Sequence, residues 1–169
     1  MPQRREHFWN AAHAILLSEE DWARRSNAVR ALIDAHDYGE ALVQAEGLPD
    51  VDDTWVAPPL PTEIQGYRCF LKQWEPGEET GIHGHPNTMF VYVISATIES
   101  TGFQRSGDTV IPHRVEEFGP RDIMTGCADN NDYDNFIHQL RCTKPGWSLH
   151  MYSDSGHRGL RFETSAPQE

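Results

Sequence analysis

The chain has 169 residues, of which 38% are hydrophobic and 24% are charged, and this is enough for one folded domain with a buried core. A formal net charge of −12 argues against general nucleic-acid binding, because the phosphates would be repelled. The apolar runs are short and the N-terminus has no apolar signal region, so we expect a cytoplasmic protein without a membrane partner.

The first 60 residues are expected to form a helical segment and a connector that pack on the rest of the chain. Ser18 is the predicted N-cap of a helix, with acidic residues in the first turn and apolar residues at helical spacing from Trp22 to Ile33. The pair Tyr38-Gly39 predicts the end of this helix. A second short helix is expected at residues 40–46, and an acidic, proline-rich connector follows.

From Gly66 onward, short runs of β-forming residues are separated by turn residues. Many short strands favour an antiparallel sandwich or barrel, which we assign to residues 61–169. The polar stretch 128–134 is interpreted as a surface loop rather than a lid. The expected strands are Tyr67–Trp74, Thr88–Glu99, Thr109–Glu117, Asn135–Arg141, Trp147–Tyr152 and Gly159–Thr164.

Two histidines, His83 and His85, are separated by a single residue. Residues i and i+2 of a strand point to the same face, so two imidazoles would project together and could hold one metal ion. His138 lies on a later strand among apolar residues. It is either a third ligand or a core histidine that makes a hydrogen bond.

One face of the strand near residue 150 carries Ser148, His150 and Tyr152, alternating with apolar residues. This face is either the solvent side of an edge strand or a relay. In a relay, Ser148 would orient His150, and His150 would orient the Tyr152 hydroxyl toward a reacting ligand.

Residues 67–162 resemble the thiol dioxygenases, the cupin group that includes cysteine dioxygenase and 3-mercaptopropionate dioxygenase. Gly77 followed after five residues by His83-Gly84-His85 matches the first cupin motif, and His138 follows at a family-like separation. The Ser-x-His-x-Tyr strand that ends at Tyr152 is the most specific element. The resemblance implies a mostly β, single-domain cupin with an N-terminal helical segment.

The chain departs from the family pattern at several positions. Phe90 stands where mammalian-type cysteine dioxygenase has a cysteine crosslinked to the relay tyrosine, so no crosslink to Tyr152 is expected. The carboxylate-binding arginine of that enzyme falls at Ala57 here. Arg161 matches the arginine of the mercaptopropionate enzymes, and Arg158 is nearby.

The resemblance implies a dioxygenase that uses Fe(II) and O2 to convert a small thiol, such as L-cysteine or 3-mercaptopropionate, into a sulfinate. Three neutral imidazoles leave the charge of a divalent metal uncompensated, which favours an anionic thiolate substrate. Tyr152 would supply a proton or a hydrogen bond, and Arg161 would hold a substrate carboxylate or form a surface salt bridge. Trp74 and Phe90 either line the pocket or pack in the core.

Two other functions remain open. The first is a cupin oxygenase that uses Ni(II), Co(II) or Mn(II) and forms an altered product, such as a rearranged cysteine-derived product of secondary metabolism. This alternative is motivated by three departures from the family pattern, at Ala57, Phe90 and Cys142. Cys142 stands where the family has an asparagine. The second is a non-catalytic zinc cupin in which Glu78, Glu79 or His113 supplies a fourth ligand. The expected partner is a small-molecule thiol, and the expected assembly is a monomer or a small homo-oligomer.

Overall fold

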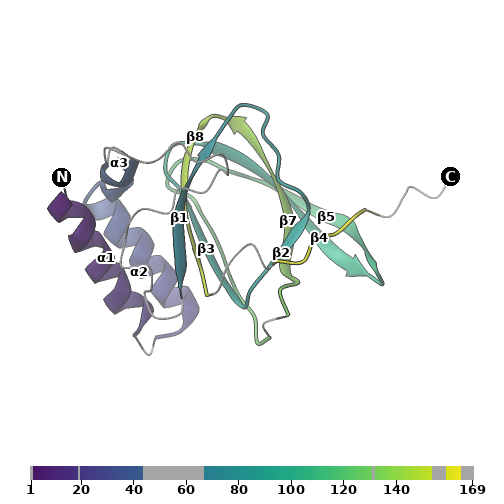
Figure 1. Cartoon of the computed structure of the whole chain (residues 1–169), viewed down its shortest axis with the longest axis horizontal. Coiled ribbons are helices and arrows are strands. Elements are labelled where there is room, and N and C mark those ends of the chain that lie inside the picture. The colour runs from purple at the N-terminus through teal and green to yellow at the C-terminus, as the bar shows by residue number, and fades with distance from the viewer. Residues whose placement is uncertain (1, 19, 44–66, 131, 154–158, 165–169) are drawn as a thin grey trace.

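The protein folds mainly into β-strands, with helices at its N-terminal end (Figure 1). The structure is a computed structural model that describes residues 2–18, 20–43, 67–130, 132–153 and 159–164. The helices are α1 (Pro2–Leu16), α2 (Trp22–Ala35) and α3 (Tyr38–Val43). The strands are β1 (Arg68–Trp74), β2 (His83–His85), β3 (Thr88–Val93), β4 (Thr97–Ser106), β5 (Thr109–Phe118), β6 (Ile123–Cys127), β7 (Asn135–Lys144) and β8 (Gly146–Tyr152).

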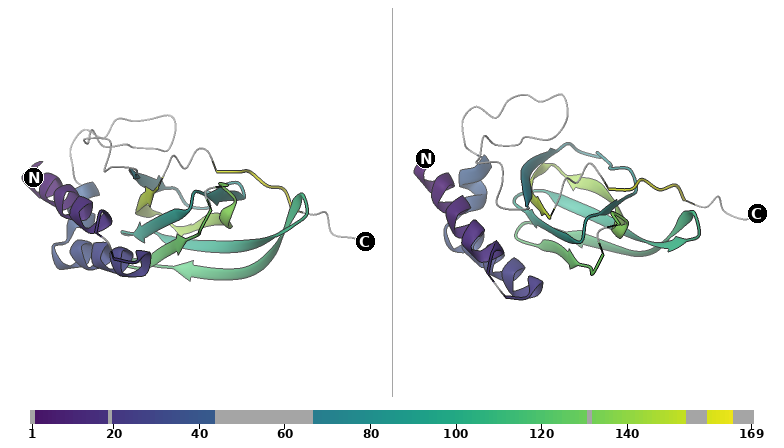
Figure 2. Two further views of the ribbon diagram at one scale, coloured as in Figure 1. Left: turned by 90° about the horizontal axis from the view of Figure 1, so that it is seen from below. Right: turned by 60° about the horizontal axis from the view of Figure 1, so that its bottom comes forward.

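Within the described residues, the strands form two four-stranded antiparallel sheets. Their orders are β1-β8-β3-β6 and β2-β7-β4-β5. Within each sheet, strands from the first half of the barrel (β1–β4) alternate with strands from the second half (β5–β8). This alternation is the strand order of a jelly roll. Figures 1 and 2 show the two sheets facing each other. The predicted fold class, a small antiparallel barrel with N-terminal helices, is therefore confirmed.

A compact apolar core lies between the two sheets. Strand alternation turns every second residue inward, and the inward residues of both sheets pack together. The sheet that contains β1 and β3 contributes Phe70, Trp74 and Val91, and the sheet that contains β4 and β7 contributes Ile98 and Leu140. Toward β2 this interior becomes polar, and the candidate site lies there.

The helices cover the outer face of the first sheet (Figure 1). Leu71, Phe90 and Met151 on this face are buried in one cluster with helix residues such as Val29 and Ile33. The described part of the predicted helical segment thus packs on the barrel. The predicted boundary between residues 60 and 61 lies outside the described residues.

Several predicted element ends are wrong. The N-cap of α2 is Asp21, whose carboxylate accepts the Arg24 N–H at 2.9 Å, and not Ser18. The Ser18 hydroxyl instead donates to the Ile15 carbonyl at 2.8 Å, and the turn from α1 into α2 follows. Tyr38 starts α3 rather than ending a helix, because Asp37 takes a left-handed conformation (φ 48°) between α2 and α3.

The strand pattern also differs from the prediction. The single run predicted from Thr88 to Glu99 is divided between β3 and β4, because the chain crosses from one sheet to the other between them. Strand β6 was not predicted. The segment predicted as a last strand, Gly159–Thr164, makes only isolated bridges to His83 and Val110. None of the helices in the described residues is long and apolar enough to span a membrane.

Candidate metal centre

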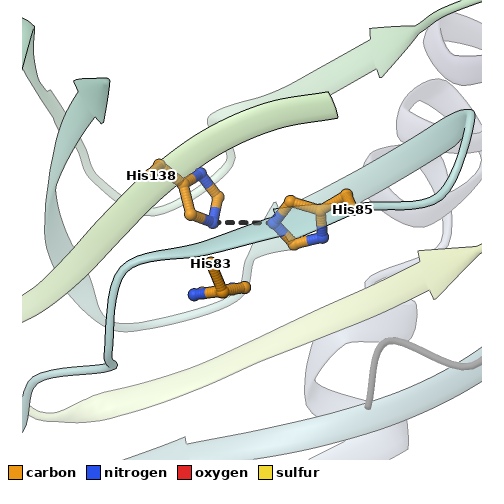
Figure 3. A group of neighbouring side chains, drawn as sticks. All are labelled: His83, His85 and His138. Carbon is orange, nitrogen blue, oxygen red and sulfur yellow. Dashed lines mark hydrogen bonds between the residues drawn. The ribbon is translucent and has the colours of Figure 1, made fainter. Parts of the chain in front are cut away.

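Three histidines from two neighbouring strands converge in the barrel interior (Figure 3). His83 and His85 come from β2, and His138 comes from β7, where it is the antiparallel partner of His83. The ring centroids are 4.7–4.9 Å apart, and the potential ligand atoms all lie within 4.8 Å of one another. The structure therefore brings together the three residues predicted as metal ligands.

The spacing of these rings fits a metal ion with further coordination positions. The Nε2 atoms of His85 and His138 are 3.0 Å apart. Two ligands of one ion, each about 2.1 Å from it, are about 3.0–3.4 Å apart in common geometries, so these two rings are close enough to share an ion. Three histidine ligands would leave positions on such an ion for further ligands.

The protonation of the rings also suits metal binding. Burial lowers the pKa of His83 to about 4, with a smaller contribution from the Arg161 guanidinium. Burial, together with the neighbouring histidines, lowers the pKa values of His85 and His138 well below the ordinary value. The Nδ1–H of His83 donates to the Gly81 carbonyl at 2.8 Å, which leaves its Nε2 lone pair for a metal.

Gly84 allows the β2 backbone to approach the loop before β7 closely. A Cβ atom at this position would lie 2.4 Å from the Tyr133 carbonyl oxygen and 2.7 Å from the Asp134 Cα. The Gly84 N–H also donates to the Leu160 carbonyl at 2.9 Å. A glycine between the two histidines is therefore a requirement of packing at this site.

His83 and His85 line a pocket of about 190 Å³. The exposed Arg161 and the half-buried His83 lie where the pocket meets solvent. The other lining residues are Lys72, Trp74, Glu78, Glu79, Thr80, Gly81, Leu140, His150 and Tyr152.

Not every predicted substrate residue lies at this pocket. Phe90 is 1% exposed and packs in the cluster that faces the helices, on the opposite face of β3 from the pocket. It therefore does not line the pocket. Arg158 and Ala57 lie outside the described residues. Arg161 lines the pocket, and among the described residues no salt bridge of Arg161 is present.

The polar residues of β8 face the barrel interior and form a chain of hydrogen bonds. Ser148 Oγ lies 2.8 Å from His150 Nε2, and His150 Nδ1 lies 2.9 Å from the Tyr152 hydroxyl. All three side chains are buried. The structure therefore has the geometry of the relay, and these residues do not form the solvent face of an edge strand.

Tyr152 is the end of this chain nearest the histidines. Its ring lies 5.1 Å from the His85 ring between centroids. Burial raises the pKa of Tyr152 above its ordinary value, so the phenol is protonated near neutral pH. Burial, with smaller contributions from Lys72 and His83, lowers the pKa of His150 to about 3. A neutral phenol and a neutral imidazole thus lie beside the three histidines.

The pocket also contains a buried lysine, Lys72, that the sequence motifs did not indicate. Lys72 is 5% exposed, and its Nζ lies 2.5 Å from Glu78 Oε1 and 4.3 Å from the centroid of the Trp74 ring. Glu78 Oε2 accepts the Glu75 N–H at 3.0 Å. Strand alternation could have revealed this lysine, because Lys72 shares a face with Phe70 and Trp74.

We expect Lys72→Met to lower the free energy of unfolding, because it leaves the Glu78 carboxylate without its cation. The expected loss is about 2 kcal/mol, less than the roughly 3–5 kcal/mol for a fully buried pair, since Glu78 keeps some contact with water. Urea denaturation measures the change. The double variant Lys72→Met/Glu78→Gln is the control and should recover most of the loss. Equal stabilities of the single and double variants would contradict this view of the pair.

None of the residues proposed as a fourth ligand of a closed zinc site belongs to the three-histidine group. Glu78 pairs with Lys72, and Glu79 lies 3.5 Å from Arg141. His113 is exposed on β5. Among the described residues, the metal-ligand group contains the three histidines and no carboxylate.

Several solved structures resemble this chain. They include an RmlC-like cupin from Shewanella frigidimarina (13% identity, TM-score 0.40, 53% of this chain and 68% of that chain) and a cupin-superfamily protein from Desulfitobacterium hafniense (12%, 0.42, 60% and 74%). A variant of oxalate decarboxylase from Bacillus subtilis is also similar (15%, 0.40, 54% and 22%). Neither a protein-family model nor a curated protein sequence matches the chain.

The order of the strands in both sheets is that of the jelly roll, and the three histidines lie on the inner surface of one of them. The chain has the cupin fold. In this barrel, the candidate metal ligands come from β2 and β7, whereas the hydrogen-bonded residues come from the facing sheet. The site is therefore assembled across the barrel.

Proposed function

We propose that this cupin is a metal-dependent dioxygenase that oxidises a small thiol to a sulfinate. The observation that carries the proposal is the combination of a three-histidine group with a buried Ser148–His150–Tyr152 chain that ends beside it. The sequence resemblance to the thiol dioxygenases rests on the same residues.

The charge of the site supports an anionic substrate. With no carboxylate in the ligand group, a divalent ion keeps its full charge, and a thiolate would compensate part of it. Arg161 adds a second positive charge at the pocket opening, suited to a substrate carboxylate. A thiol with a carboxylate a few bonds away matches both features.

The protein residues then have distinct tasks. The three histidines would hold the ion, with Fe(II) as the first candidate, and the bound metal would supply the site at which thiolate and O2 meet. Tyr152 holds a proton beside this site, and His150 and Ser148 keep its hydroxyl in place. Arg161 orients the substrate by its carboxylate.

Metal analysis of the purified protein, combined with O2 uptake on a panel of thiols, tests the proposal. The panel contains L-cysteine, 3-mercaptopropionate and cysteamine, and each reaction is repeated after loading with Fe(II), Ni(II), Co(II) or Mn(II). Mass spectrometry should show a product with two added oxygen atoms. If no metal supports O2 uptake with any thiol, the proposal is wrong. A rearranged product with a metal other than iron would favour the alternative cupin oxygenase.

We expect Arg161→Ala to raise the KM for thiols that carry a carboxylate by about 10- to 100-fold, because a charge-assisted hydrogen bond is lost. The KM for cysteamine, which has no carboxylate, should not rise. Steady-state O2 uptake measures both values. Arg114→Ala is the matched control, since Arg114 is an exposed arginine on β5 that pairs with Glu116. An unchanged KM for every thiol would remove Arg161 from the substrate site.

A further inference from the structure

The hydrogen-bond chain extends one residue beyond the predicted relay. The indole Nε1–H of Trp74, on β1, donates to Ser148 Oγ at 2.8 Å. Trp74 is 1% exposed and Ser148 is 0% exposed, so both side chains are almost fully buried. The complete chain therefore runs from Trp74 through Ser148 and His150 to Tyr152.

Trp74 gives this chain a direction, because an indole N–H can donate but never accept a hydrogen bond. If the Ser148 hydroxyl donates to His150 Nε2, the Nδ1–H of His150 donates to the Tyr152 oxygen. In this direction each donor from Trp74 to His150 has an acceptor, and only the Tyr152 proton has none within the chain of hydrogen bonds. Because Tyr152 lines the pocket, water or a ligand there can accept this proton.

The opposite direction leaves the Ser148 hydroxyl as the donor without an acceptor, and Ser148 does not line the pocket. Tyr152 would donate to His150 Nδ1, and His150 Nε2–H would donate to Ser148 Oγ. Ser148 would then accept from both His150 and Trp74, and its own proton would need a further acceptor. The part of the chain that the structure describes shows no other hydrogen bond of Ser148. An unsatisfied buried donor is costly, so the population of the opposite arrangement should be lower by about tenfold or more.

The neighbours of Trp74 hold its ring in place. The Lys72 ammonium lies over the ring, and Glu78 fixes that ammonium. On the far side of the chain, the Phe70 ring stacks on His150 with centroids 4.6 Å apart and an interplanar angle of 16°. Rigid side chains therefore support both the Trp74 end and the His150 ring.

We propose that Trp74 is a positioning residue that sets the tautomer of His150, with the proton on Nδ1, and so makes Tyr152 a hydrogen-bond donor to the metal site. The ligand beside Tyr152 must then be an acceptor, such as a thiolate sulfur. The statement about the ligand rests on the proposed function, whereas the tautomer does not.

Nitrogen NMR of the zinc-loaded protein tests the proposal, because zinc is diamagnetic and the measurement needs no turnover. With 15N-labelled histidine, long-range proton–nitrogen correlations distinguish a protonated ring nitrogen from an unprotonated one. The His150 signals are assigned by their loss in His150→Asn. We expect Nδ1 to be protonated and Nε2 unprotonated in the wild-type protein. A proton on Nε2 would overturn the proposal without bearing on thiol oxidation.

The variant Trp74→Phe tests the role of the indole. The smaller ring leaves space in which water can accept the Ser148 proton, so the Nε2-protonated tautomer should rise to a detectable fraction. Trp147→Phe is the matched control and should keep the wild-type tautomer, because Trp147 packs on the helix-facing side of β8. If Trp74→Phe also keeps the wild-type tautomer, Trp74 does not set it. The wild-type measurement tests the direction of the chain even if the variant fails to fold.

Discussion

Replacing His138 with alanine should abolish stoichiometric metal binding. His138 is the cross-strand partner of His83 and one of three candidate ligands, and among the described residues the group contains no fourth side chain that could replace it. Loss of a residue that merely supports a ligand lowers metal affinity by about 10- to 100-fold, and loss of a ligand should cost more. Elemental analysis after dialysis against a defined metal concentration measures the effect.

The control for this experiment is His113→Ala. His113 is an exposed histidine on β5 and should have no effect on the metal content. Far-UV circular dichroism of both variants checks that the barrel is intact. Retention of one metal per chain in His138→Ala would show that the ion lies elsewhere. The proposed function would then be wrong.

Replacing Gly84 with alanine should lower the metal affinity without removing any ligand. The new Cβ would lie 2.4 Å from the Tyr133 carbonyl oxygen, and backbone atoms cannot yield as a flexible side chain can. β2 must therefore move, and the two histidines that flank Gly84 move with it. We expect a loss of about 1–3 kcal/mol of stability from overpacking, together with weaker metal binding. Thermal unfolding and metal titration measure the two effects.

Gly119→Ala is the matched control for this substitution. The nearest atom that its Cβ would meet is the Asp122 carboxylate oxygen at 3.8 Å, an ordinary contact distance. This variant should keep both stability and metal affinity. If Gly84→Ala behaved in the same way, the close approach of β2 to the loop at residues 133–134 would not be needed to position the histidines.

The sequence alone predicts much of the metal centre because strand alternation is a local property. His83 and His85 share a face wherever their strand lies, and the same holds for Ser148, His150 and Tyr152. Both predictions concern residues two positions apart, for which the backbone determines the relative orientation. The resemblance to known cupins then joins His138 to the first pair.

Alternation cannot show which face of a strand turns inward when both faces are apolar. Every residue of β3 is buried, because one face packs inside the barrel and the other packs on the helices. Phe90 could therefore be expected at the pocket, although it lies on the opposite face. The division of the predicted run from Thr88 to Glu99 has a related cause, since both of its parts form strands and only the sheet topology separates them.

By itself, the sequence determines that two histidines share one face of a strand and that Ser148, His150 and Tyr152 share one face of another. The tertiary structure decides that Trp74 lies against Ser148 and that Lys72 lies against both Trp74 and Glu78. Trp74 and Ser148 are 74 positions apart in the chain and meet only because β1 pairs with β8. Cross-strand register depends on the packing of the whole barrel, so the direction of the hydrogen-bond chain emerges only when the fold is complete.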